Sequence, residues 1–190
     1  MADSGAARLG VEAAERLSSL GWPEVEVERG LSDAEFAGIE ADFGFEFSDE
    51  HRAFLAARLP VGPSWPDWRR GGRRSLNKWL GLPVEGVLFA VEWSQFWGDG
   101  WGPRPVRMKD AVRTARYRLA RVPQLIPVFA HHYLAAGRAA SGGPVLSVVR
   151  IDVAVVGSDL VDYVDNQFGS GGTRTAGPTR SVDFWSGLMS

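Results

Sequence analysis

The sequence of 190 residues contains no cysteine. This absence excludes disulfides, iron–sulfur clusters, cysteine-bound zinc and a thiol nucleophile. Long apolar runs are also missing, since the longest extends only from Leu125 to Ala130. We therefore predict no membrane-spanning segment. No apolar stretch follows the acidic residue Asp3 near the N-terminus, so we predict no secretion signal and expect a soluble, cytoplasmic protein.

The common catalytic motifs are absent too. The sequence has no GxSxG nucleophile turn, no phosphate-binding Walker loop and no HExxH pair. We therefore predict no metal site and no cofactor. The candidate catalytic groups are His131 and His132, but neighbouring side chains on a strand point to opposite faces. We expect one ring to be buried and hydrogen-bonded and the other solvated, with pairing to Asp152 or Asp159 as the alternative.

The apolar content is sufficient for a folded core. Helical patterns dominate the first part of the chain and strand patterns the later part, which favours a single α+β domain. We expect a mainly antiparallel sheet flanked by helices. The predicted organisation is an N-terminal helix and lead-in strand (1–29), the main domain (30–168), a Gly/Ser/Thr/Pro-rich loop (169–181) and a C-terminal segment that packs back (182–190).

The N-terminal half carries the clearest local signals. Residues 10–20 have helical spacing, and Val25 and Val27 alternate with glutamate as in a strand. Ser32 and Glu35 form a capping box for a helix that Gly44 ends. Ser48 is placed to cap a further helix, whose inward face we expect to hold Phe54, Leu55 and Leu59.

The rest of the chain is less regular. No period is visible from Pro60 to Arg74. The patterns beyond it predict helices over 75–80, 84–97, 108–122 and 159–168, the last capped by Gly157 and Ser158, and strands over 125–130, 145–149 and 153–156.

Charge is distributed unevenly. Residues 1–50 contain 13 acids and three bases, whereas residues 51–190 contain ten acids and 18 bases. The two halves either neutralise each other in the fold or present faces of opposite sign to partners.

The segment WRRGGRRSLNKW (residues 68–79) combines two tryptophans with five bases and no acid. Arginine and tryptophan together suit a phosphate backbone with stacked bases. The bases of this possible nucleic-acid site are Arg69, Arg70, Arg73, Arg74 and Lys78. The simpler interpretation is a solvated loop whose positive charges neutralise the acidic N-terminal half. The overall charge of the chain is not basic, which makes nucleic acid an improbable partner.

Four segments in order resemble the SUKH superfamily, which includes the fungal Smi–Knr cell-wall regulators and many bacterial proteins. They are GLSDAEFAGIEADFGFEFSDEHRAFLAARLPVG (30–62), GVLFAVEWSQFWGDGWGPRP (86–105), VPQLIPVFAHHYL (122–134) and GGPVLSVVRIDVAVVGSDLVDYVDNQF (142–168), with FWSGL (184–188) as a further match. The resemblance implies an α+β domain without catalytic activity. Bacterial members resemble immunity proteins that bind and block a co-encoded toxin, often a nuclease.

The predicted function is therefore non-enzymatic protein binding, with a cognate toxin as partner. An acidic face on the N-terminal helices is suited to a basic, nucleic-acid-binding toxin, and loop tryptophans are suited to anchor it. The candidate contact residues are Asp33, Glu40, Asp42, Trp65, Trp68 and Trp101. Two alternatives remain open: nucleic-acid binding through residues 68–79, and a hydrolase that uses His131 or His132. The sequence does not define the oligomeric state.

Overall fold

The computed structural model describes residues 4–21, 25–169 and 180–189. Its α-helices are α1 (Ser4–Ser19), α2 (Asp33–Phe43), α3 (Asp49–Ala57), α4 (Arg73–Trp93), α5 (Met108–Leu119) and α6 (Leu160–Phe168). Its strands are β1 (Glu26–Arg29), β2 (Arg58–Val61), β3 (Leu125–Phe129), β4 (His132–Ala135), β5 (Val145–Val149) and β6 (Asp152–Gly157). Two short 3-10 helices are η1 (Arg138–Ala140) and η2 (Ser186–Leu188).

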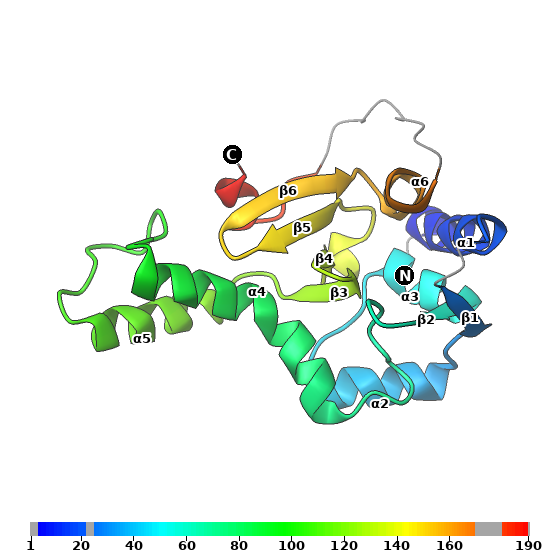
Figure 1. Cartoon of the computed structure of the whole chain (residues 1–190), viewed down its shortest axis with the longest axis horizontal. Helices are drawn as coiled ribbons and strands as arrows, with labels where there is room; N and C mark the ends of the chain where they lie inside the picture. Colours follow the sequence, from blue (N-terminus) through cyan, green and yellow to red (C-terminus); the bar gives the residue numbers. More distant parts are fainter. Residues whose placement is uncertain (1–3, 22–24, 170–179, 190) are drawn as a thin grey trace.

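Both sheets are antiparallel. Strands β1 and β2 form a two-stranded sheet, and β3, β4, β5 and β6 form a four-stranded sheet in chain order. Helices lie around the larger sheet, and the α4–α5 pair extends at one end of the molecule (Figure 1). The structure thus confirms the predicted α+β class with antiparallel sheets and flanking helices.

The predicted caps of α2 and α3 are present. The Ser32 hydroxyl accepts from the Glu35 amide, and the Glu35 carboxylate accepts from the Ser32 amide at 2.7 Å. Gly44 ends α2 in the left-handed conformation, with φ of 70°. Ser48 caps α3 by accepting from the His51 amide. These bonds satisfy backbone groups that a helix end otherwise leaves without partners.

Several predicted boundaries are corrected. Helix α1 begins at Ser4 rather than Gly10, and α3 ends at Ala57, so Leu59 lies on β2 instead of the helix. The cap of α6 is Asp159, whose side chain accepts from the Asp162 amide, rather than Gly157 and Ser158. Strands β2 and β4 were not predicted. Both are four residues long and lack an alternating pattern, so only pairing with their neighbours identifies them.

Helix α4 is continuous, whereas the sequence predicted two helices, over 75–80 and 84–97. Pro83 lies inside it and removes one backbone donor, which usually interrupts a helix. Burial on both sides of the proline offsets this cost: Leu76 and Leu80 are buried before it, and Val87 and Val91 after it. Helix α4 ends at Trp93, four residues before the predicted end at 97, so Trp97 lies outside the helix.

Two clusters of buried side chains form the core. The first joins α1, α2, α3 and α6 with residues around Trp65 and Trp68 and with side chains of β3, β4 and β5. The second joins α5 and the C-terminal segment with other side chains of the same larger sheet. Helix α4 contributes to both clusters, with Leu80 in the first and Val87 in the second.

The ends of the described chain belong to this core. Helix α1 packs on α3 and α6. Val182 and Trp185 are buried, and the Trp185 indole donates to the Pro123 carbonyl at 2.8 Å, so the C-terminal segment packs back as predicted. Most of the predicted loop 169–181 lies outside the described residues.

Candidate partner-binding surface

The three loop tryptophans proposed as exposed anchors are buried. Trp65, Trp68 and Trp101 have exposed fractions of only 5%, 4% and 7%. The Trp65 ring stacks on Phe168 at 5.6 Å between centroids, and Trp101 stacks on Phe184 at 5.8 Å. The expectation of exposure is wrong because both aromatic partners come from distant parts of the chain, which local spacing does not show.

The three acids proposed for a partner have partners within the chain. Asp33 is exposed but forms an ion pair with Arg52 at 2.7 Å. Glu40 is mostly covered, and its carboxylate accepts from the Phe47 amide at 3.1 Å. Asp42 is exposed and receives a longer contact of 3.8 Å from the Arg73 guanidinium. Of the three, Glu40 therefore has a structural role that its sequence position did not indicate.

Arg69 lies at the centre of an ion-pair cluster. Its guanidinium contacts Glu35 at 2.7 Å and Glu28 at 2.9 Å, and it also donates to the carbonyls of Arg29 and Gly30. The Arg69 guanidinium, followed by the Ser32 donors, lowers the pKa of Glu35 to about 2. Since only 15% of the Arg69 side chain is exposed, this arginine fastens the segment to β1 and α2.

The other bases of residues 68–79 divide into two groups. Arg70 contacts Glu28 at 2.7 Å, and Arg73 lies beside Asp42. Arg74 and Lys78 are exposed and form no ion pair within the described part of the chain. Three of the five bases in this segment therefore form ion pairs with acids of the N-terminal half, so most of the predicted nucleic-acid surface is neutralised within the chain.

The two histidines differ in environment, as the sequence predicts. His131 is exposed, and His132 is buried on β4. The Nδ1 atom of His132 lies 2.9 Å from the Tyr163 hydroxyl, which replaces the suggested pairing with Asp152 or Asp159. Desolvation, followed by the neighbouring His131, lowers the pKa of His132 to about 4. A neutral, hydrogen-bonded ring of this kind is accounted for by packing alone.

A group of buried polar residues at the start of α3 was not predicted. Glu50 is fully buried, and desolvation raises the pKa of its carboxyl to about 8, with the Asp159 charge acting in the same direction. His51 beside it is also buried, and desolvation lowers its pKa to about 3. Acids in a first helical turn usually face water near the helix dipole, so no local pattern indicates this burial.

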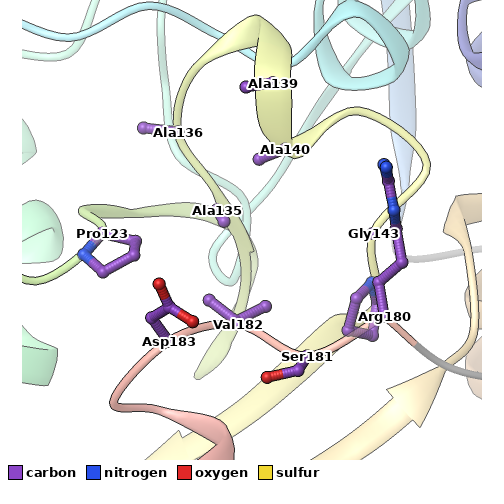
Figure 2. Close-up of a pocket in the computed structure, with 11 residues that line it drawn as sticks. Pro123, Ala135, Ala136, Ala139, Ala140, Gly143, Arg180, Ser181, Val182 and Asp183 are labelled. Atoms are coloured by element: carbon purple, nitrogen blue, oxygen red, sulfur yellow. The ribbon is translucent and has the colours of Figure 1, made fainter.

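A surface pocket of about 410 Å³ lies between the β3–β4 region and the C-terminal segment. Figure 2 shows alanines from β4 and η1 around it, with Arg180 and Asp183 on the opposite wall. The Arg180 guanidinium donates to the Ser141 carbonyl at 2.8 Å. Neither histidine of the pair and none of the buried acids lines this pocket, so it does not bring candidate catalytic groups together.

Helix α4 carries exposed apolar side chains along one face. Leu82, Phe89 and Trp93 are 47%, 41% and 70% exposed, and their spacing places them on one stripe. The rings of Phe89 and Trp93 are 6.2 Å apart at 30°, and the Arg150 guanidinium lies 4.6 Å from the centre of the Phe89 ring. We call these four residues the α4 stripe. Sequence reasoning missed it because Phe89 and Trp93 fit equally well into a buried helical face.

The approach of Arg150 to α4 depends on Gly86. A side-chain carbon at this position would lie 2.8 Å from the Arg150 Cα atom, closer than such contacts occur. The glycine therefore allows the β5–β6 turn to pack directly against the helix, which fixes Arg150 beside the aromatic rings.

Comparison with family models, curated proteins and solved structures finds no match for this chain. Function is therefore inferred from the chain's own residues. Among the residues that the structure describes, no helix is long and apolar enough to cross a membrane. The same residues contain no group of three acids or histidines arranged to hold a metal ion.

Proposed function

We propose that the protein is a non-enzymatic binding module that contacts a partner protein through the α4 stripe. The observation that carries this proposal is the exposure of Phe89 and Trp93 beside Arg150 on one helix face. Aromatic and arginine side chains dominate the binding energy of protein interfaces. A rigid helix also presents them at little conformational cost, since α4 is anchored in both core clusters.

Within this class, we propose that the partner is a toxin that the protein neutralises. The resemblance of four ordered segments to SUKH proteins supports this narrower function, and the α+β architecture is compatible with it. The burial of Trp65, Trp68 and Trp101 moves the proposed contact away from those loops. The pairing of Asp33 and Glu40 within the chain likewise removes support from an acidic contact face on α2.

Affinity purification from the source cells, followed by a growth assay, tests this function. We expect one stoichiometric protein to stay bound at moderate salt, and its production alone to arrest growth. Co-production of the intact chain restores growth. If the bound protein is harmless when produced alone, the proposed binding function is retained and the proposed immunity role is rejected.

Substitutions on the α4 stripe test the contact itself. The double variant Phe89→Ala, Trp93→Ala should weaken partner binding by at least about 30-fold, because truncation of an energetically important interface residue costs more than about 1 kcal/mol. The matched control is Val155→Ala, which truncates another exposed apolar residue, on β6. Affinity equal to that of the intact chain in the double variant would reject the stripe as the contact.

A further inference from the structure

A second surface differs in character from the α4 stripe. Residues 107–121, which include α5, contain six cationic side chains and one acid, Asp110. At 1.5 Å per residue they extend over about 20 Å, or roughly one net positive charge per 4 Å. A nucleic-acid strand in a duplex carries one negative charge per about 3.4 Å, so the two charge densities are closely matched.

The fold directs this charge to solvent. Ala111, Ala115 and Leu119 of α5 are buried in the second core cluster. The outward positions, four residues apart, form one line along the helix and continue just beyond its end. They are Lys109, Arg113, Tyr117 and Arg121, and all four are exposed. We call these residues the α5 row.

Most of the positive charge near the α5 row is not neutralised. Arg113 pairs with Asp110 at 2.8 Å, and Arg116 pairs with Glu85 of α4 at 3.1 Å, both in exposed geometries that contribute little to stability. Arg121 donates to the Tyr117 carbonyl and lies over the Tyr117 ring at 3.6 Å, so it has an ordered position but no opposing charge. Lys109 and the neighbouring Arg107 form no ion pair within the described residues.

We propose that the α5 row binds the phosphate backbone of a nucleic-acid duplex, independently of the contact at the α4 stripe. The prediction against nucleic acid rested on the overall charge balance. The fold weakens that objection, because acids of the N-terminal half pair with Arg69, Arg70 and Arg73. Two α5 cations pair with other acids, Arg113 with Asp110 and Arg116 with Glu85, and the remaining cations of residues 107–121 form no ion pair among the described residues.

The composition of the row favours a duplex over an acidic protein. A protein interface needs an apolar centre, whereas the row contains one aromatic ring whose face Arg121 already covers. A helix that presents cations along one exposed line can follow a phosphate strand without reading bases. We therefore expect binding that is independent of sequence and depends strongly on salt.

Fluorescence anisotropy with a labelled DNA duplex of about 20 base pairs tests the proposal, with salt varied from about 50 to 200 mM. We expect the intact chain to bind at the lowest salt and to lose affinity as salt rises. The triple variant Lys109→Gln, Arg113→Gln, Arg121→Gln should bind at least about tenfold more weakly. The slope of log affinity against log salt should fall by about 2–3, one contact being worth about 0.9.

A charge-matched variant provides the control. Arg8→Gln, Arg58→Gln, Arg180→Gln removes three exposed cations outside residues 68–79 that form no ion pair among the described residues. This control should bind like the intact chain. Circular dichroism checks that both variants are folded. The single variant Lys109→Gln alters a side chain without an ion pair, so it should lower the slope by about 1 even if the triple variant is less stable.

Three results would overturn the proposal. The first is no binding of the duplex at the lowest salt. The second is equal weakening in the control, which would show a diffuse effect of net charge. The third is competition by polyglutamate as effective as that by unlabelled duplex, which would make the α5 row a site for an acidic protein.

Discussion

Glu50 is an acid at the start of a helix, where sequence reasoning expects contact with water. Helix α1 covers this part of α3, and Gly10 of α1 lies directly against the Glu50 backbone carbonyl. The carboxyl itself is buried near Asp159 and the Gly142 backbone, and burial favours its protonated form, so its pKa rises to about 8 from an ordinary value near 4.5. Burial of this kind depends on an element that is distant in sequence, so no local pattern predicts it.

The buried carboxyl gives the protein a specific pH dependence of stability. Folded Glu50 holds its proton up to a pH of about 8, whereas in the unfolded chain it loses the proton above about 4.5. Stability therefore falls as pH rises through this range. His51 acts at lower pH: its folded pKa of about 3 lies below the unfolded value of 6.5, so its contribution is lost only as pH falls below 6.5.

Denaturant unfolding between pH 7 and 8 reports mainly on Glu50, since in this interval His51 and His132 are neutral in the folded state and mostly neutral in the unfolded state. We expect the free energy of unfolding of the intact chain to fall by about 1 kcal/mol over this interval. Glu50→Gln should remove most of the fall, because the amide does not ionise. Glu92→Gln, the same change on an exposed part of α4, should leave the fall in place. A fall that persists in Glu50→Gln would assign the pH dependence to another group.

At the scale of single elements, prediction succeeded where the signal was local. The caps of α2 and α3 depend on side chains three residues apart, and the structure contains both. It failed for α4, because tertiary burial on both sides of Pro83 overrides the usual effect of a proline. It failed for β4 because this strand lies between β3 and β5 with all four residues buried, which removes the alternation of a half-exposed strand.

The candidate site was less predictable than the fold. Sequence patterns identified aromatic and charged residues but not their exposure. Trp65 and Trp93 have the same side chain, yet one is 5% exposed and the other 70%. The difference arises from neighbours such as Phe168, which become neighbours only when the chain folds.

The crossing of α1 and α3 offers a prediction at this scale. A side-chain carbon at Gly10 would lie 2.1 Å from the Glu50 carbonyl oxygen and 2.9 Å from the Ala53 Cβ atom. Gly10→Ala should therefore lower the free energy of unfolding by about 2–3 kcal/mol, since the helices must separate. Thermal and denaturant unfolding measure this change.

Gly38 on α2 is the matched control. No atom lies within 4 Å of a side-chain carbon built there. Gly38→Ala should raise stability by about 0.5–1 kcal/mol through the higher helix propensity of alanine. Equal stability of the two alanine variants would mean that α1 and α3 do not approach as closely as described.

At the scale of the whole molecule, charge and packing are organised differently. Acids of the N-terminal half form ion pairs with Arg69 and its neighbours, whereas the cations of α5 are exposed to solvent. The apolar core is divided into two clusters, and α4 belongs to both. Since α4 and strands β3, β4 and β5 contribute to both clusters, we expect the clusters to unfold together rather than in succession.

Trp185 tests this cooperativity. It is fully buried in the second cluster, where its indole donates to Pro123. Trp185→Ala should lower the free energy of unfolding by about 3–5 kcal/mol while the chain still unfolds in a single transition. Trp93→Ala, the same substitution at an exposed site, should cost less than about 1 kcal/mol. Two separate transitions in Trp185→Ala, followed by circular dichroism, would show that the clusters are independent.

The distribution of the tryptophans has a practical consequence for spectroscopy. Trp65 and Trp68 lie in the first cluster, and Trp101 and Trp185 in the second. Intrinsic fluorescence therefore reports on both halves of the core at once. In a variant that lacks the chain's other four tryptophans, replacing the pair in one cluster with phenylalanine leaves emission from the other, so the order in which the halves form during refolding becomes observable without any attached dye.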